Sequence, residues 1–126
     1  MMWVFRIKIG DIHHGDELAA VDCYSGYGEA RNDPDRIREA GLGPIPIGAY
    51  LIGHEDEDVD KHGPIALHLL PLTGTETFGR SAFMCHGDSA LHPGAASHGC
   101  IIAPKPVRER MADGPDKLLI VLSGAY

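Results

Sequence analysis

The stretch HGDSALHPGAASHGC (residues 86–100) lies between two short apolar runs, AFMCH (82–86) and GCIIA (99–103). Its glycines, proline, aspartate and serines are typical of turns, and each flanking run is too short for a helix. The segment therefore predicts two strands joined by an irregular loop. Histidines stand at the start and near the end of this loop, and Cys100 directly follows its last glycine. The same few residues predict a type of fold and a candidate site.

The rest of the chain repeats this pattern of short apolar runs between turn residues. Sixteen glycines and nine prolines in 126 residues interrupt the chain too often for a helical bundle. Because no regular helices alternate with the runs, we predict a mainly β fold, a single compact antiparallel domain over residues 1–126. The expected strands are 3–9, 18–24, 46–53, 65–70, 82–86, 99–103 and 117–122.

Two short helices are expected beside these strands. The first covers 34–40, with Asp33 as the N-cap, Pro34 at the first helical position and Gly41 beyond the end. The second covers 106–112, and it also begins with a proline and is followed by a glycine.

Charge and hydropathy exclude several classes of protein. The formal net charge is −7 and the Lys and Arg residues do not cluster, so nucleic acid is not an expected partner. No run approaches the roughly 18 apolar residues of a membrane span, so membrane insertion is not expected. The first ten residues, MMWVFRIKIG, carry charges inside the apolar run and predict a strand. We therefore expect synthesis in the cytoplasm without a signal peptide.

The acidic and cysteine residues leave two questions about metals and disulfides. The run EDEDVD (55–60) predicts a solvated loop, because the glycine and spacing of a calcium-binding EF-hand loop are missing; calcium is the alternative. Cys23, Cys85 and Cys100 form no CxxC pair, and three is an odd number, so a disulfide framework is not expected.

Cys100 has the sequence context of a nucleophile. A cysteine nucleophile needs a base, access to substrate, and hydrogen-bond donors for the oxyanion. The turn before Cys100 can aim backbone N–H groups at a developing negative charge, and Gly99 adds no Cβ to hinder the substrate. We expect His86 to be the base and to ionise the thiol partly near neutral pH. Strand alternation puts Met84 and His86 on one face and points Cys85 into the core.

Two other interpretations remain open from spacing alone. A single cysteine in a β-rich chain is often a small buried hydrophobe, and a single histidine is often a hydrogen-bonded spacer. Alternatively, His86, His92, His98 and Cys100 could bind zinc, although their intervals do not match structural zinc patterns.

The motif His86-Gly87 followed by Ser97-His98-Gly99-Cys100 resembles the signature of the YkuD-type L,D-transpeptidase catalytic domains. This resemblance covers nearly the whole chain and implies an L,D-transpeptidase-like β-sandwich with one or two short helices. Further blocks resemble, in order, those of the Tlde1/DUF2778 group of type VI secretion effectors: CYSGYGEARNDP (23–34), GPIPIGAYLIG (43–53), GPIALHLLP (63–71) and GRSAFMCHGDS (79–89).

The resemblance assigns a role to each residue of the motif. It implies Cys100 as nucleophile, His86 as general base, and the Gly87 carbonyl as the group that orients the imidazole. Ser97 is expected to brace the turn, and the turn at His98, Gly99 and Cys100 to supply the oxyanion amides. His98 is expected to shape the pocket rather than to transfer protons.

Substrate contacts are less well defined. Many cell-wall transpeptidases of this superfamily carry Arg or Asn soon after the cysteine, whereas the first arginine here is Arg108. Arg108 and Arg80 are candidates to bind a substrate carboxylate, with structural or solvent-exposed charges as the alternative. Tyr24 and Ser25 are candidates to line the cleft, with a core position equally open for Tyr24.

The implied activity is that of a peptidoglycan-targeting cysteine enzyme without cofactor or metal. It would act on the L,D bonds of stem peptides as an L,D-carboxypeptidase, in D-amino acid exchange, or as an L,D-transpeptidase. The family implies an antibacterial effector, a toxin delivered by the secretion machinery into the periplasm of a Gram-negative target cell and matched by a cognate immunity protein. The alternative is a non-catalytic module of the same fold that binds cell-wall fragments or zinc.

Overall fold

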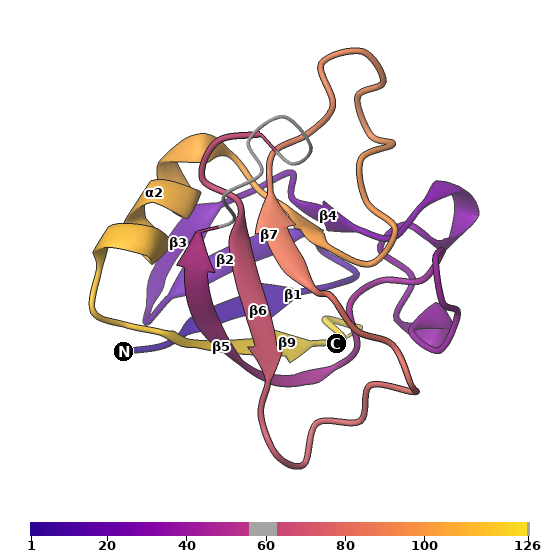
Figure 1. Cartoon of the computed structure of the whole chain (residues 1–126), viewed down its shortest axis with the longest axis horizontal. Coiled ribbons are helices and arrows are strands. Elements are labelled where there is room, and N and C mark those ends of the chain that lie inside the picture. Colours follow the sequence, from indigo (N-terminus) through magenta and orange to yellow (C-terminus); the bar gives the residue numbers. More distant parts are fainter. Residues whose placement is uncertain (56–62, 126) are drawn as a thin grey trace.

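The computed structural model describes residues 1–55 and 63–125, and in this part of the chain nine strands form one sheet (Figure 1). The order across the sheet is β3-β2-β1-β9-β5-β6-β7-β8-β4. The strands are β1 (Trp3–Arg6), β2 (Asp11–His14), β3 (Glu17–Ala20), β4 (Tyr24–Ser25), β5 (Gly48–Glu55), β6 (Leu67–Pro71), β7 (Met84–His86), β8 (Ile101–Ile102) and β9 (Leu118–Leu122).

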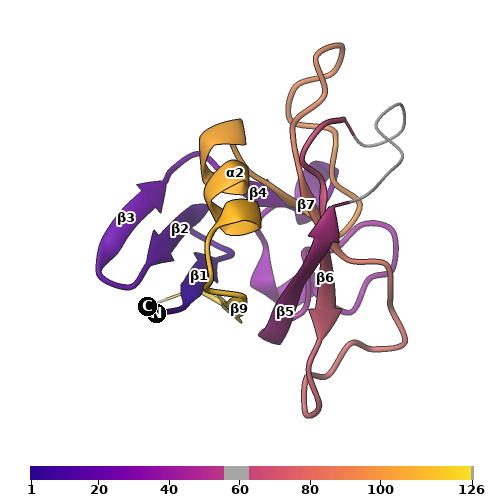
Figure 2. The ribbon, with the colours of Figure 1, turned by 60° about the vertical axis from the view of Figure 1, so that its left-hand side comes forward.

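The sheet is mainly antiparallel, and it curls. Among the described strands, β1 with β9 and β7 with β8 are the parallel pairs. Figure 2 shows β1, β2 and β3 on one arm of the curl and β5, β6 and β7 on the other. The helix α2 (Lys105–Asp113) lies between the two arms and contacts β5 and β7. The predicted mainly β fold with short helical elements is therefore confirmed, as one continuous curled sheet.

The hydrophobic core fills the inside of the curl. Strand alternation directs one set of side chains inward from nearly every strand, and these are almost fully buried. Loop residues and the helix α2 add further side chains to this core, and its largest fully buried members are Trp3, Phe5, Ile7, Ile12, Ile45, Tyr50, Leu67, Leu69, Ile101, Met111, Leu119 and Val121.

Most expected elements are present, with shifted ends. The helix expected at 106–112 is α2, and the strands expected at 46–53, 65–70, 82–86, 99–103 and 117–122 correspond to β5, β6, β7, β8 and β9.

Two expected strands are interrupted by a backbone in the left-handed region. The strand expected at 3–9 ends at Arg6 and turns back through Gly10 (φ +77°) into β2, whose sequence DIHH is too polar to be predicted as a strand. The strand expected at 18–24 is divided into β3 and β4, because Asp22 between them has a φ of +57° and breaks the extended chain.

The helix expected at 34–40 is a single 3-10 turn, η2 (Pro34–Arg36), capped as predicted by the Asp33 side chain. A second 3-10 turn, η1 (Gly28–Ala30), precedes it. The Arg36–Glu39 ion pair, three residues apart, fits this tighter winding. In the acidic run 55–60, only Glu55 lies within the described residues, so the expectation for this run falls outside the described structure.

Candidate functional site

The predicted catalytic residues His86 and Cys100 belong to neighbouring parallel segments of the sheet. In the β7–β8 register, His86 pairs with Ile102. Continuing this register backwards by two residues places Cys100 beside Met84, two residues from His86 along the strand. Because side chains alternate, His86, Met84 and Cys100 share the outer face of the sheet, whereas Cys85 is fully buried in the core. The predicted inward direction of Cys85 is confirmed.

His86 is oriented by the residue that follows it. Its Nδ1 lies 2.9 Å from the carbonyl oxygen of Gly87. A carbonyl can only accept a hydrogen bond, so this contact assigns the ring proton of a neutral imidazole to Nδ1 and the lone pair to Nε2. The ring is buried. An imidazole held in this tautomer has the form that a general base requires.

The turn before Cys100 is built around the fully buried hydroxyl of Ser97. Its Oγ donates to the Cys100 carbonyl at 2.6 Å and accepts from the N–H groups of Gly26 at 2.9 Å and Gly99 at 3.2 Å. Ser97 thus makes the bracing contacts expected of it. The Gly99 N–H already donates to Ser97. It could donate to a substrate oxyanion only by giving up this 3.2 Å hydrogen bond.

Arg80 lies against the turn at residues 97–100. Gly99 has a φ of +133°, and a Cβ at that position would overlap the Arg80 guanidinium. The arginine is buried, and its guanidinium donates to three main-chain carbonyls of segment 37–44 at distances from 2.5 to 2.8 Å. These bonds use the guanidinium to fasten segment 37–44 against the turn. They favour the structural alternative for Arg80 over carboxylate binding.

Arg108 has the same relation to the turn after His86. A Cβ on Gly87 would lie 2.8 Å from Nη2 of Arg108. The buried guanidinium donates to the carbonyls of Ala103 at 2.9 Å, Pro64 at 2.7 Å and Ile65 at 3.1 Å. For Arg108, too, these contacts favour a structural role over carboxylate binding.

The environment of Cys100 raises the pKa of its thiol. Burial is the main cause, while a backbone hydrogen bond from Met84 and the positive charge of Arg80 act in the opposite direction. The expectation of a partly ionised thiol near neutral pH is therefore wrong for the protein without substrate, because burial outweighs the two favourable contacts. A nucleophilic Cys100 would have to lose its proton during the reaction.

Cys100 opens into a cavity of about 390 Å³. Its walls are residues 40–41, 79–83 and 98–100. His86 is not among the lining residues, so Cys100 is the member of the predicted pair that lines the cavity. Segment 37–44, held by Arg80, supplies one wall, and the turn that ends at Cys100 supplies another.

His98, which was expected to shape the pocket, lies in the wall of this cavity. Its Nδ1 is 2.9 Å from the carbonyl oxygen of Gly41, and its ring stacks on Tyr27 with centroids 4.7 Å apart. The side chain is exposed. The contacts of Gly41 and Tyr27 with His98 were not predicted from the sequence, since they join segments far apart in the chain.

Tyr24 and Ser25 are placed away from the cavity. Burial and the neighbouring Asp88 raise the pKa of Tyr24 to about 12. Its hydroxyl donates to Asp88 Oδ1 at 2.6 Å and accepts from the Ala96 N–H at 2.9 Å, which fixes the loop from β7 to β8. Ser25 is fully buried and its Oγ accepts from the Ile45 N–H. Neither residue lines the cavity at Cys100, although Ser25 is paired with Ile101 in the β4–β8 register.

Asp88 is a further residue that the sequence reasoning missed. Its carboxylate accepts from the N–H groups of Ser89 and Gly94 as well as from Tyr24. The sequence His-Gly-Asp-Ser contains a signal for this role, because an aspartate in a turn commonly bonds nearby backbone amides. These bonds shape the long loop that Figure 1 shows between β7 and β8.

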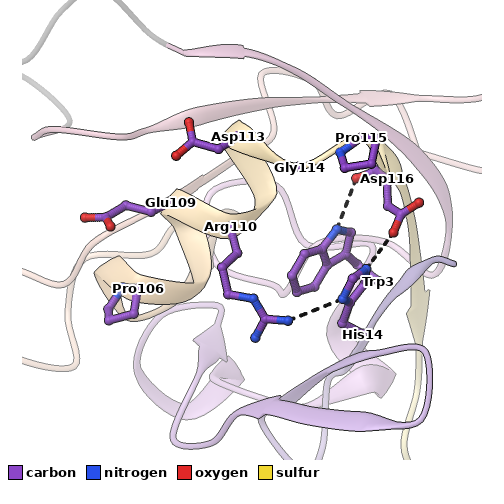
Figure 3. A pocket seen from close by; sticks show the side chains of 9 residues that line it. All are labelled: Trp3, His14, Pro106, Glu109, Arg110, Asp113, Gly114, Pro115 and Asp116. Carbon is purple, nitrogen blue, oxygen red and sulfur yellow. Dashed lines mark hydrogen bonds and ion pairs between the residues drawn. The ribbon is translucent and has the colours of Figure 1, made fainter.

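A larger cavity, of about 540 Å³, lies beside α2 (Figure 3). Here the Trp3 ring stacks on His14 with centroids 4.1 Å apart, and His14 Nε2 lies 2.7 Å from Asp116 Oδ2. The Arg110 guanidinium lies 5.4 Å from the centre of the Trp3 ring. The residues that line this larger cavity include no serine or cysteine. A His–Asp pair without a nucleophile does not provide for acyl transfer, so the smaller cavity at Cys100 is the candidate site.

Neither a cluster of metal ligands nor a membrane-spanning helix is present in residues 1–55 and 63–125. Within these ranges no group of three or more His, Cys, Asp or Glu residues is arranged to hold a metal ion. None of the helices in these ranges is long and apolar enough to cross a membrane.

Comparison with known proteins supports the family and the fold. No curated protein matches the chain significantly. Among solved structures, Bd1075 of Bdellovibrio bacteriovorus is similar in fold, with a TM-score of 0.58 at 11% sequence identity. The match covers 97% of this chain but 47% of Bd1075, so the chain spans about half of that protein. The model of the Tlde1 domain matches residues 19–117. The chain therefore belongs to the Tlde1 family of L,D-transpeptidase-like type VI effector domains.

Proposed function

We propose that this protein is a cysteine acyl-transferase or hydrolase that acts on the L,D bonds of peptidoglycan stem peptides, with Cys100 as nucleophile and His86 as general base. The proposal rests on the common face that the β7–β8 register gives His86 and Cys100, two residues apart along the strands, with Cys100 lining a cavity. The bond from His86 Nδ1 to the Gly87 carbonyl supports it, because it orients the base.

In the first step, Nε2 of His86 accepts the thiol proton while the Cys100 sulfur attacks the carbonyl carbon on the L side of the scissile bond. The developing oxyanion would be stabilised by backbone N–H groups of the turn at Gly99 and Cys100. Because burial raises the pKa of Cys100, proton transfer and attack are expected to be coupled. Arg80 lies close enough to stabilise the thiolate through its charge.

In the second step, the carbon–nitrogen bond breaks and the imidazolium of His86 donates its proton to the departing D-alanine amine. The product is a thioester on Cys100. Water would then release the shortened peptide, a free D-amino acid would give exchange, and the amine of a second stem peptide would give a cross-link. In each case His86 again accepts a proton from the incoming nucleophile.

Action on the cell wall would take place in the periplasm of a Gram-negative target cell after delivery by the secretion machinery. A cognate immunity protein would then protect the producing cell. A version fused to an export signal is expected to cause swelling or lysis of a Gram-negative host, and Cys100→Ala is expected to abolish this effect. Equal toxicity from the cytoplasm would contradict a periplasmic target.

Stereochemistry gives the sharpest test of the substrate. Two synthetic tetrapeptide stems that differ only in the configuration of the last alanine are incubated with the protein, and the alanine released from each is measured. We expect release from the D-terminated peptide alone, because inverting the centre moves the carbonyl away from the oxyanion donors, each worth about a hundredfold in rate or more. Comparable release from both peptides would overturn the assignment to L,D bonds.

A further inference from the structure

The loop between β7 and β8 joins the two residues of the proposed catalytic pair, and one hydroxyl group holds both of its ends. Tyr24 lies in β4, the edge strand next to β8. Its hydroxyl donates to Asp88 Oδ1 at 2.6 Å and accepts from the Ala96 N–H at 2.9 Å. Asp88 comes two residues after His86, and Ala96 comes four residues before Cys100. The hydroxyl therefore connects the segment of the proposed base with the segment of the proposed nucleophile.

Asp88 fixes the first end of this loop. Its Oδ1 also accepts from the N–H groups of Ser89 at 2.8 Å and Gly94 at 3.1 Å. The carbonyl of Gly87, which lies 2.9 Å from His86 Nδ1, belongs to the same planar peptide group as the Asp88 N–H. A rotation of the backbone at Asp88 therefore also turns the acceptor that orients the imidazole.

The second end of the loop is fastened to the same part of the chain. Ala96 is followed by Ser97, whose Oγ accepts from the Gly26 N–H at 2.9 Å. Gly26 comes two residues after Tyr24. The Ser97 Oγ also donates to the Cys100 carbonyl at 2.6 Å. The two residues that lead into the turn before Cys100 are thus both bonded to segment 24–26.

Packing keeps the Tyr24 hydroxyl between the two ends of the loop. The tyrosine is 6% exposed, and the Arg31 guanidinium lies 5.0 Å from the centre of its ring. The same guanidinium lies against the loop, because a Cβ added to Gly94 would be 2.7 Å from Arg31 Nη1. The tip of the loop, by contrast, projects into solvent, with Leu91 86% exposed. The contacts of the loop are therefore concentrated at the ends that lead to the proposed catalytic pair.

We propose that Tyr24 is a positioning residue: its hydroxyl ties the two ends of the loop together and thereby sets the geometry between His86 and Cys100. The effect on turnover rests on the proposed function of this pair. Proton transfer requires the base to be within hydrogen-bond reach of the thiol, and a misplacement of about 1 Å can lower the rate about a hundredfold. Tyr24 is not among the residues that line the cavity at Cys100, so it acts through the loop and not on the substrate.

Tyr24→Phe tests this role, because it removes the hydroxyl and keeps the ring. We expect kcat for the D-terminated tetrapeptide to fall about tenfold or more while KM changes less than about twofold, since the cavity is intact and the reacting groups are misplaced. A tyrosine that only stabilised the fold would leave kcat of the folded protein unchanged. Thr75→Val is the matched control and should retain the wild-type kcat, because Thr75 Oγ1 also makes one donor and one acceptor bond, to the carbonyl and N–H of Ala49, both at 2.9 Å. Circular dichroism establishes that each variant is folded.

The tautomer of His86 gives a second readout, which needs no substrate. Side-chain nitrogen chemical shifts distinguish a neutral ring protonated at Nδ1 from one protonated at Nε2. We expect the Nδ1–H form in the wild type and in Thr75→Val, because the Gly87 carbonyl accepts from Nδ1. In Tyr24→Phe this carbonyl is no longer held in place, so a mixture with the Nε2–H form is expected. A kcat equal to that of Thr75→Val would overturn the proposal, as would an Nδ1–H form fully retained in Tyr24→Phe.

Asp88 provides the comparison if Tyr24→Phe changes the fold. Its Oδ1 accepts all three bonds, from Tyr24, Ser89 and Gly94, so Asp88→Asn keeps the acceptor and should retain most of the wild-type kcat. Asp88→Ala should lose about as much as Tyr24→Phe, and the double variant no more than either alone, because both act through one bond. Equal kcat in Asp88→Asn and Asp88→Ala would contradict the positioning role. If the wild type does not cleave the tetrapeptide, the proposed function fails, while the tautomer comparison still decides whether Tyr24 orients His86.

Discussion

Cys85 and Cys100 lie in adjacent segments of the sheet, and each has a buried arginine beside it. The charge of Arg108 favours the Cys85 thiolate, and the charge of Arg80 favours the Cys100 thiolate. Each arginine donates to main-chain carbonyls and lies against a glycine of the candidate site. The two cysteines therefore have similar supporting contacts.

The difference lies in which face of the sheet each cysteine occupies. Cys85 is fully buried in the core, and burial raises its pKa to about 12. Cys100 is partly exposed and shares the outer face with His86. A buried arginine beside a cysteine is therefore common to both sites. Under the proposed function, Cys100 differs from Cys85 in lining a cavity and in sharing a face of the sheet with a histidine.

The largest expected effect separates the two cysteines by activity. Cys100→Ala should lower turnover of the D-terminated tetrapeptide by at least about a thousandfold, because the nucleophile is lost. Cys85→Ala should retain activity and lower the free energy of unfolding by about 1 kcal/mol, because a small group is lost from the core. Alanine release and urea unfolding measure the two quantities. Loss of activity in a folded Cys85→Ala protein, with Cys100→Ala active, would reverse the assignment.

The next effect concerns the two arginines together. Arg80→Met removes the donor of two buried carbonyls, Gly43 and Pro44, and Arg108→Met removes the donor of one, Ala103; each also frees partly buried carbonyls. A buried carbonyl without a donor costs about 1–3 kcal/mol, so we expect each variant to lose about 1 kcal/mol or more of unfolding free energy, with the larger loss for Arg80→Met, measured by urea denaturation. The exposed ion pair Arg110–Glu17 provides the control, since Arg110→Met should cause only a small fraction of that loss. Equal small losses in all three variants would contradict the bracing role.

A smaller effect distinguishes Arg80 from Arg108 through the pH dependence of Cys100 labelling. Arg80 lowers the pKa of the Cys100 thiol, so Arg80→Gln should raise that pKa further. The thiolate is the reactive form, so iodoacetamide labelling of Cys100 should slow severalfold below the pKa and recover as the pH rises above it. Arg108→Gln should leave the labelling profile of Cys100 unchanged. Peptide mapping at several pH values measures the labelling rate of Cys100. An identical shift of the labelling profile in Arg80→Gln and Arg108→Gln would contradict a specific effect of Arg80 on Cys100.

The smallest effect is expected at the wall of the cavity. His98→Ala removes the stacking on Tyr27 and the contact with Gly41, both at the surface. We expect KM to rise a fewfold with kcat nearly unchanged, because the residue shapes the cavity and transfers no proton. A large loss of kcat in a folded variant would assign His98 to the chemistry instead.

The fold was predictable where apolar runs are bounded by turn residues, as for β6, β9 and the β7–β8 pair. The strand β2 was not, because its sequence DIHH gains its place from pairing with β1 and not from its own composition. The direction of Cys85 followed from the alternation of side chains in a strand.

The contacts of the arginines could not be predicted from the sequence. Arg80 bonds carbonyls of segment 37–44, far earlier in the chain, and Arg108 bonds carbonyls of Pro64 and Ile65. Such bonds depend on how loops meet in three dimensions, which no local pattern records. The pKa of Cys100 was missed for the same reason, since burial by distant segments decides its direction.

Trapping the covalent intermediate tests the central claim most directly. The protein is mixed with the D-terminated tetrapeptide, quenched in acid within the first turnovers, and analysed by intact mass and peptide mapping. We predict an added mass equal to the peptide without its terminal alanine, carried by Cys100 as a thioester and absent from Cys100→Ala. An adduct on Cys23 or Cys85, or alanine release that continues at the wild-type rate in Cys100→Ala, would contradict the claim.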